Sequence, residues 1–177
     1  MGIYISDEDL TVYKFSVKLR NMKDSRTINA KVLIRAEWIF IAAIFLGFLI
    51  NIFCPLDVIP KYIRFSLGPI LLILSAWIML PSWDLFKKNR TPVNPYKQTI
   101  SLVTEGTYKY SRNPQYLSRV VIQVAFGLLF GNIWIIIMVV PAMILVWYAV
   151  ILPEEKYLEQ RFGKKYLQYK SSVRCWV

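Results

Sequence analysis

Two polar segments carry the side chains that are best suited to chemistry. The first, GTYKYSRNPQY over residues 106–116, places Arg112 and Asn113 directly before Pro114. A proline disfavours helical backbone at the residue before it, so Asn113 is expected to keep backbone groups free for a ligand. The second segment opens with the carboxylate pair 154–155, directly after a long apolar run. Because ionisable groups at the edge of hydrocarbon are costly, these carboxylates are candidate functional residues.

Histidine is absent from the 177 residues. Imidazole general bases, Ser-His and Cys-His nucleophile pairs, and His-ligated metal or haem sites are therefore excluded. Acid–base chemistry is left to Glu, Asp, Lys, Tyr and Cys, and we predict no metal site. Tyr108, Tyr110 and Tyr116 add aromatic rings and hydroxyl groups to the first polar segment.

The composition indicates which kind of protein must position these groups. Hydrophobic residues make up 56% of the chain and the mean hydropathy is +0.41. Soluble domains are about 45–50% apolar, and the excess here lies in long blocks. The formal net charge is +11, but the basic residues flank the apolar blocks, so we predict no nucleic-acid partner. The chain is predicted to be an all-α, polytopic integral membrane protein whose main partner is the lipid bilayer.

Four apolar runs are predicted to cross the bilayer. The first approaches the roughly 20 residues that a spanning helix needs, whereas the third is short and contains Arg119 and Gln123. Gly131 and Asn132 are predicted to turn the last two spans into a helical hairpin, and Pro141 is expected to kink the final span. The predicted spans are about residues 38–55, 65–83, 117–131 and 133–152 of a membrane domain over residues 36–177, with polar segments at residues 1–35, 84–116 and 153–177.

Basic residues predict the orientation of these spans. If four segments cross, only Lys61 and Arg64 of the 22 lysines and arginines fall on the far side. Cytoplasmic loops are enriched in Lys and Arg, so both termini, the insert over residues 84–116 and the C-terminal tail are expected in the cytoplasm. Cys54 and Cys175 would then lie on opposite faces, and we expect neither a disulfide between them nor a thiolate metal cluster.

The terminal segments are predicted to lie at the bilayer surface. Residues 1–35 begin with acidic residues rather than an apolar core, which predicts no cleavable signal peptide. In the tail, apolar residues recur at helical spacing opposite many charges, which predicts a surface helix. The apolar residues that recur at helical spacing are Tyr157, Leu158, Phe162, Tyr166, Tyr169 and Val173.

The order and spacing of these residues resemble the integral-membrane methyltransferases of the isoprenylcysteine carboxyl methyltransferase and phospholipid methyltransferase type. The resemblance covers about residues 86–173, half of the chain, and no nucleotide-binding glycine fingerprint accompanies it. It is carried by Leu102-Val103-Thr104, then Gly106-x-Tyr108, then Arg112-Asn113-Pro114-x-Tyr116, and after the hairpin by Glu154-Glu155-x-x-Leu158-x-x-x-Phe162-Gly163-x-x-Tyr166-x-x-Tyr169.

The resemblance implies a methyltransferase that uses S-adenosylmethionine, bound by cytosolic segments, to methylate a lipophilic or small thiol, carboxylate or amine acceptor. In it, residues 113–116 would wrap the cofactor, Glu154 would bind it from the tail, and Arg112 would hold the segment by pairing with Glu154 or Glu155. The cofactor-binding residues so implied are Leu102, Val103, Tyr108, Arg112, Asn113, Pro114, Gln115, Tyr116, Glu154 and Glu155.

Two departures from the resemblance bear on the chemistry. Many relatives have histidine where Asn113 stands, and asparagine cannot titrate, so no proton relay is assigned there. The prenylcysteine enzymes place an arginine four residues before the cofactor glutamate, where this chain has Val150. This valine argues against a prenylcysteine carboxylate as the acceptor, and no catalytic residue is assigned.

Three other classes of protein remain as alternatives. Membrane reductases of the sterol type share the C-terminal architecture and bind a nicotinamide cofactor, but they are typically longer and have more spans. A non-catalytic scaffold would tolerate replacement of Tyr108, Asn113 and Glu154. A small channel or transporter is disfavoured because the spans contain almost no ionisable residue except Arg119 near one end. The acceptor and the oligomeric state are left open.

Overall fold

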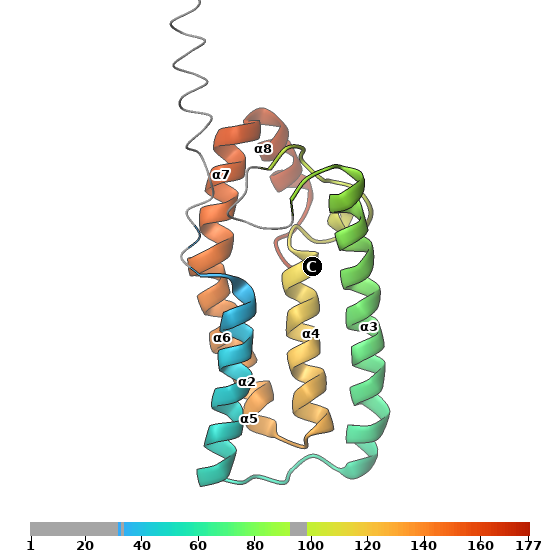
Figure 1. Ribbon diagram of the computed structural model, residues 1–177, viewed down its shortest axis with the longest axis vertical. Helices are drawn as coiled ribbons and strands as arrows, with labels where there is room; N and C mark the ends of the chain where they lie inside the picture. Colours follow the sequence, from blue (N-terminus) through green and yellow to red (C-terminus); the bar gives the residue numbers. More distant parts are fainter. Residues whose placement is uncertain (1–31, 33, 93–98) are drawn as a thin grey trace, which may run out of the picture.

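The computed structural model describes residues 32, 34–92 and 99–177, and every regular element within them is helical (Figure 1). The surface helix expected in the N-terminal segment lies outside the described residues. The elements are α2 (Ala36–Phe53), α3 (Lys61–Lys88), the 3₁₀ turn η1 (Gly106–Lys109), α4 (Pro114–Leu129), α5 (Ile133–Ile137), α6 (Val139–Val146), the π-helical turn η2 (Trp147–Ile151), α7 (Leu152–Phe162) and α8 (Lys164–Ser172).

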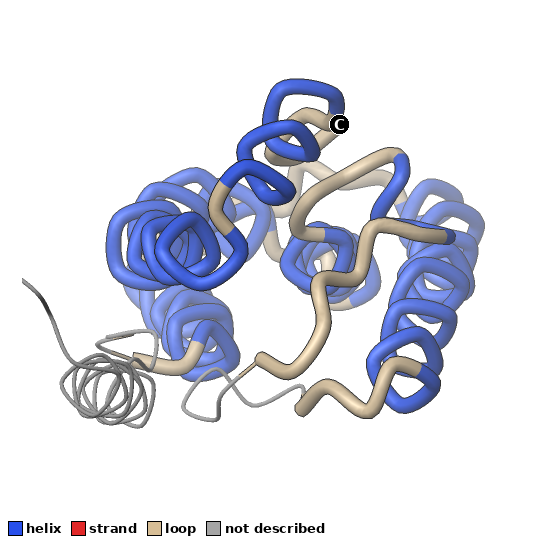
Figure 2. The backbone as a smooth tube through the Cα atoms, turned by 90° about the horizontal axis from the view of Figure 1, so that it is seen from above, coloured by secondary structure: helices blue, strands red, loops and turns tan. Residues whose placement is uncertain are grey.

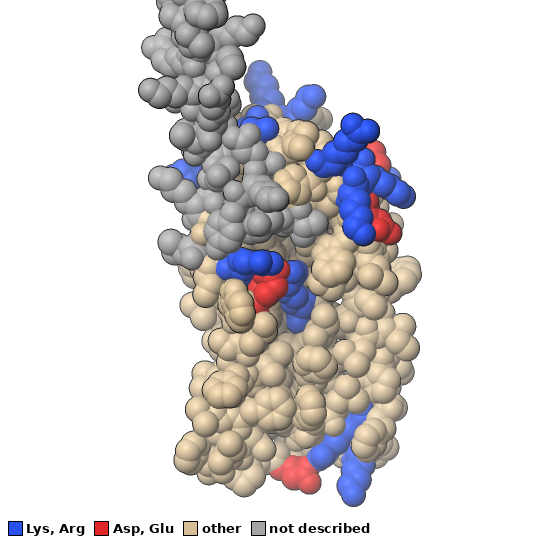
Figure 3. Space-filling model, in the orientation of Figure 1, with Lys and Arg blue, Asp and Glu red and all other residues tan. Residues whose placement is uncertain are grey.

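The long helices stand side by side along the molecular axis (Figure 1). Helix α3 packs against α4, whereas α2 packs against α5 and α6. Helix α7 continues upward from the bundle and α8 folds back over this end, where loop segments cross the bundle (Figures 1 and 2). In the space-filling view, basic side chains gather at the end that carries α7 and α8, and a broad uncharged band lies below them (Figure 3).

Three helical stretches of the described residues are long and apolar enough to cross a membrane. They are Ala36–Phe53, Lys61–Lys88 and Ile133–Phe162, so the chain is a multi-pass membrane protein. Helix α4 covers most of the third predicted span but has 16 residues and is not one of the three. Three of the four predicted spans therefore have the length and composition of a membrane-crossing helix.

Helix α3 is longer than the second predicted span at both ends. Helix α3 begins at Lys61 and continues to Lys88, beyond the expected limits of residues 65–83. Apolarity marks the part of a helix that lies in hydrocarbon, whereas polar residues continue the same helix outside it. Lys87 and Lys88 occupy the last turn, where positive charge is favourable next to the negative end of the helix dipole. The first part of the predicted insert is thus helical.

The last helical stretch continues beyond the predicted limit of the fourth span. The α-helix is interrupted at Met138, because Pro141 lacks the amide that would bond to the carbonyl of Ile137. Near Pro153, the amide of Leu152 bonds to the carbonyl of Trp147, five residues back. This π-helical turn carries the helix past Pro153 without an end, so α7 extends the span to Phe162.

The turn predicted at Gly131 and Asn132 is confirmed. Gly131 has a φ of +63°, a left-handed conformation that glycine adopts without steric cost. The Asn132 side chain accepts a hydrogen bond from the Trp134 amide at 3.0 Å and so caps α5. Its Nδ2 donates to the carbonyl oxygen of Gly47 at 3.3 Å, which ties the turn to α2.

Small residues let α2 approach its neighbours closely. Ala43 and Gly47 lie four residues apart on its buried face. A Cβ atom added to Gly47 would lie 2.8 Å from the Ile135 backbone, closer than real contacts allow. Inside a membrane, such close backbone approach replaces the hydrophobic drive that packs soluble helices. This contact therefore fixes α2 against α5, beneath the site end of the bundle.

Candidate active site

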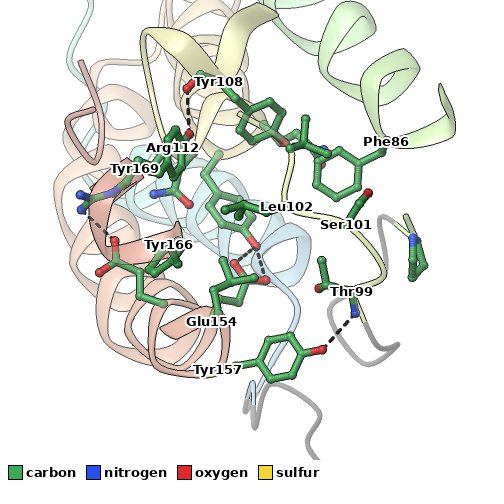
Figure 4. Close-up of a pocket in the computed structure, with 17 residues that line it drawn as sticks. Phe86, Thr99, Ser101, Leu102, Tyr108, Arg112, Glu154, Tyr157, Tyr166 and Tyr169 are labelled. Atoms are coloured by element: carbon green, nitrogen blue, oxygen red, sulfur yellow. Dashed lines mark hydrogen bonds and ion pairs between the residues drawn. The ribbon is translucent and has the colours of Figure 1, made fainter. Parts of the chain in front are cut away.

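A cavity lies where the C-terminal part of α3, the loop over residues 99–113, the first turn of α4, and helices α7 and α8 meet (Figure 4). The space inside it, together with its mouth open to solvent, is about 900 Å³. Pro114, at the first helical position of α4, is fully buried and is absent from the lining. The other nine predicted site residues line the cavity: Leu102, Val103, Tyr108, Arg112, Asn113, Gln115, Tyr116, Glu154 and Glu155.

Glu154 and Tyr116 join the two polar segments inside the cavity. The Tyr116 hydroxyl, from α4, donates to the Glu154 carboxylate of α7, and both carboxylate oxygens lie 2.9 Å away (Figure 4). The residues are 38 positions apart in sequence. A hydrogen bond to a carboxylate is stronger than one between neutral groups, so it orients Glu154 within the lining.

The Tyr108 side chain is also held in place in the cavity wall. It is buried on η1, and its ring lies 5.6 Å from the Phe86 ring, measured between centroids. The Gln115 side-chain amide donates to the Tyr108 hydroxyl oxygen at 3.2 Å, and the Tyr169 hydroxyl donates to the Tyr108 carbonyl at 2.8 Å. Burial raises the pKa of Tyr108, and it raises the pKa of Tyr169 to about 12. Both phenols are therefore protonated at neutral pH; the Tyr169 hydroxyl donates a hydrogen bond, and the Tyr108 hydroxyl accepts one.

Arg112 pairs with Glu155, which decides between the two partners expected for it. Its Nη2 lies 2.8 Å from Glu155 Oε1, and both side chains are nearly buried. Its Nη1 donates to the carbonyl oxygens of Lys170 at 2.7 Å and Val173 at 3.1 Å. Lys170 Nζ approaches the second Glu155 oxygen at 2.8 Å. Glu155 is thus held by two cations, and Arg112 ties the loop to α7 and to the C-terminal segment.

Asn113 begins α4 and also binds the end of the chain. Its backbone is not helical, as Pro114 predicts, with φ of −129° and ψ of 51°. Its Nδ2 lies 3.2 Å from both the carbonyl oxygen and the Sγ of Cys175. Burial raises the pKa of the Cys175 thiol. Cys54 and Cys175 are both free.

The tail contributes cavity residues that the sequence interpretation placed at the bilayer surface. Tyr157 and Tyr166 are 4% and 2% exposed, so the apolar side of the tail faces the protein. The Tyr157 hydroxyl accepts a hydrogen bond from the Thr99 amide at 3.0 Å. Helical spacing reveals an apolar face but not what covers it, which explains the error. The cavity residues absent from the predicted site are Phe86, Pro92, Thr99, Ser101, Tyr157, Leu158, Tyr166 and Tyr169.

The lining combines the Glu154 carboxylate, the ion pair of Arg112 and Glu155, tyrosine side chains and apolar walls. The Glu154 carboxylate can accept hydrogen bonds from hydroxyl or ammonium groups, and aromatic faces can stabilise a cation or stack on a planar base. Leu102, Val103 and Leu158 provide apolar surface. Within the described residues, no group of three or more His, Cys, Asp or Glu side chains could hold a metal ion. The lining therefore offers a carboxylate, phenol groups and aromatic faces to a small molecule.

A sequence model of the phospholipid methyltransferase family matches residues 63–165, more than half of the chain. The chain belongs to this family. The match runs from α3 into the start of α8 and includes all ten predicted site residues, whereas α2 and residues 166–177 lie outside it. No curated protein and no solved structure matches the chain significantly. Membership of the phospholipid methyltransferase family makes this a membrane methyltransferase rather than a membrane reductase of the sterol type.

Proposed function

We propose that this methyltransferase takes its methyl group from S-adenosylmethionine bound in the cavity beside Glu154. The meeting of Tyr116 and Glu154 supports the proposal best, because it joins the two segments that the family resemblance assigns to the cofactor. Nine of the ten residues implied for this role line one cavity. The cofactor is a cation with ribose hydroxyls and a planar adenine, which is the kind of molecule that this lining suits.

Different residues of the cavity would contact different parts of the cofactor. Glu154 would accept hydrogen bonds from its hydroxyl or ammonium groups, and the neutral Tyr108 phenol would donate one. Leu102 and Val103 would cover its apolar surface. When bound, S-adenosylmethionine supplies a methyl group on a sulfonium centre that is already activated for transfer. The aromatic walls of the chain would keep water away and stabilise positive charge.

The acceptor is a lipophilic or small thiol, carboxylate or amine. The cavity lies at the end of an apolar bundle, so a lipid-like acceptor can approach from the bilayer. A thiolate or carboxylate needs positioning more than proton removal, and positioning can contribute about 7–11 kcal/mol. An amine must arrive deprotonated. Val150, fully buried in the apolar core one helical turn before Glu154, offers no cation to a prenylcysteine carboxylate.

The proposed topology has four crossings and places both termini and the site in the cytoplasm. Helix α4 lies beside α3 at a similar height in the bundle, so it would act as the fourth crossing despite its 16 residues (Figure 1). Lys61 and Arg64 lie at the start of α3, at the end away from the site. The basic residues around the cavity then follow the enrichment of Lys and Arg in cytoplasmic segments.

Methyl transfer can be tested with the protein reconstituted in vesicles and S-adenosylmethionine labelled in its methyl group. The vesicles would contain a mixed membrane lipid extract, and a lipophilic thiol, a lipophilic carboxylate and a lipophilic amine would be supplied in parallel. We expect label in the lipid phase with at least one acceptor, and none with the Glu154→Gln variant. Protein that binds S-adenosylhomocysteine but labels none of these acceptors would contradict catalysis.

A further inference from the structure

An ion pair between a buried arginine and a partly exposed glutamate connects α2 to the first turns of α4, next to the cavity. Arg119 is the only charged residue of α4, and its side chain is 10% exposed. Its Nη2 lies 2.7 Å from Oε1 of Glu37, 82 residues earlier in the chain. Burying a charge at the edge of hydrocarbon is costly, and an ion pair with good geometry offsets only part of that cost. A buried arginine at this position therefore indicates a function beyond stability.

The same guanidinium also contacts two residues of the site. Its Cζ lies 5.6 Å from the centroid of the Tyr116 ring, a cation–π distance. Its Nη1 donates to the Gln115 carbonyl at 2.7 Å. Tyr116 orients Glu154, and the Gln115 side chain binds the Tyr108 hydroxyl. Arg119 itself is absent from the cavity lining, so it can act on a ligand only through these neighbours.

We propose that Arg119, held by Glu37, is a positioning residue that fixes the Tyr116 ring so that its hydroxyl orients Glu154 for the cofactor. This inference rests on the proposed function. The contacts run from Glu37 in α2 through Arg119 and Tyr116 in α4 to Glu154 in α7, and so link three separate parts of the chain. Helix α2 lies outside the segment matched by the family, yet it holds one end of this series.

If the pair of Arg119 and Glu37 only stabilised the fold, the effect of replacing Arg119 on ligand affinity would be the same with and without the Tyr116 hydroxyl. This difference provides the test. S-adenosylhomocysteine would be titrated by calorimetry into purified wild-type protein and into the variants Arg119→Gln, Tyr116→Phe and the double variant. We expect Arg119→Gln to weaken binding about tenfold, the scale of one cation–π contact with its orienting effect. In the Tyr116→Phe background, which lacks the hydroxyl, the same change should alter affinity by less than about twofold.

Arg35→Gln is the matched control. Arg35 also lies near Glu37, with Nε and Oε2 3.4 Å apart, but it is half exposed, and the cation over the Tyr116 ring is Arg119. We expect wild-type affinity from this variant. If Arg119→Gln does not fold, Arg119→Lys keeps the charge but loses the planar guanidinium. Arg119→Lys should then weaken binding in the wild-type background and not in the Tyr116→Phe background.

Two outcomes would overturn the inference. Wild-type affinity in the folded Arg119 variants would show that Arg119 does not position the site, and an equal loss in both backgrounds would show that it does not act through Tyr116. Both outcomes leave the proposed function intact, because the wild-type protein still binds the ligand. Wild-type protein that binds no adenosyl compound would instead contradict the proposed function together with this inference.

Discussion

Replacing Glu154 is expected to weaken cofactor binding while the protein still folds. Glu154→Gln keeps the shape of the side chain and removes the charge that accepts hydrogen bonds from a ligand. A hydrogen bond to a charged group contributes about 1.5–3 kcal/mol, so we expect S-adenosylhomocysteine to bind at least about tenfold more weakly. Calorimetry on the purified variant measures this change.

Glu159→Gln provides the matched control for that experiment. Glu159 lies on the same helix, pairs with Lys170 at 2.6 Å, and is absent from the cavity lining. We expect near-normal affinity from this variant. Equal losses in the two variants would show that charge on α7 in general, and not Glu154 itself, supports binding.

The Cys175 thiol offers a test of the geometry at the end of the chain. Burial raises the pKa of this thiol, so less thiolate is present at a given pH in the folded protein than in the unfolded chain. In a Cys54→Ser background, the rate of maleimide labelling should rise with pH through a midpoint above the ordinary thiol value of about 8.5. Denatured protein should show the ordinary midpoint, and equal midpoints in the two states would contradict the buried placement.

The family resemblance named cavity residues in the two polar segments, and local sequence predicted the backbone at Asn113. Asn113 and Pro114 were readable because a proline constrains its predecessor, and the structure shows the non-helical backbone expected there. The pair of Arg119 and Glu37 could not be predicted, because nothing in one sequence connects positions 82 residues apart. Arg119 stood out only as a charge in an apolar run.

At the scale of elements, Arg112 connects the loop before α4 to α7 and to the C-terminal segment. Arg112→Gln would leave Glu155 buried with Lys170 as its remaining cation. Removing one partner of a buried ion pair costs about 3–5 kcal/mol, and the retained lysine favours the lower end. For a chain of this size, about 3 kcal/mol corresponds to a fall in Tm of roughly 6–12 °C. Thermal unfolding in detergent measures the shift.

Arg174→Gln is the comparison variant for Arg112→Gln. Arg174 is exposed on the same C-terminal segment, and its backbone carbonyl accepts the Arg112 amide at 3.0 Å. Because a side-chain substitution leaves that backbone contact in place, we expect a change in Tm near zero. A similar fall in both variants would indicate that loss of positive charge, rather than loss of the contacts of Arg112, destabilises the protein.

The helices that contain long apolar runs could be predicted, but the residues at which they begin and end could not. The long apolar runs predicted α2 and α3, and Gly131 predicted the turn after α4. The continuation of the last span into α7 was missed because Pro153 normally ends a helix. The π-helical turn before it supplies an alternative hydrogen bond, and this choice depends on packing rather than on local sequence.

At the scale of the whole molecule, the four-span topology predicts which positions share a membrane face. Single cysteines in place of Lys109, Lys165 and Lys61, in a Cys54→Ser/Cys175→Ser background, can be labelled by an impermeant maleimide in sealed vesicles of known orientation. We expect Lys109→Cys and Lys165→Cys to react from the cytoplasmic side and Lys61→Cys from the other. Labelling of the first two from opposite sides would exclude a fourth crossing by α4.

The site exists only because the whole chain folds. Its lining comes from α3, the loop after it, α4, α7 and α8, all meeting at one end of the bundle (Figures 1 and 4). The sequence indicated that two polar segments flank the last two apolar runs, and so predicted that they share a membrane face. It could not indicate that the tail turns its aromatic side inward, because that depends on where α7 continues.

The central claim is that this cavity binds S-adenosylmethionine, and one titration tests it most directly. S-adenosylmethionine and S-adenosylhomocysteine would be titrated by calorimetry into purified wild-type protein in detergent, with a nicotinamide dinucleotide as the control ligand. We predict saturable binding of one molecule of either adenosyl compound per chain and no binding of the dinucleotide. Folded protein that binds neither adenosyl compound, or that binds only the dinucleotide, would contradict the claim.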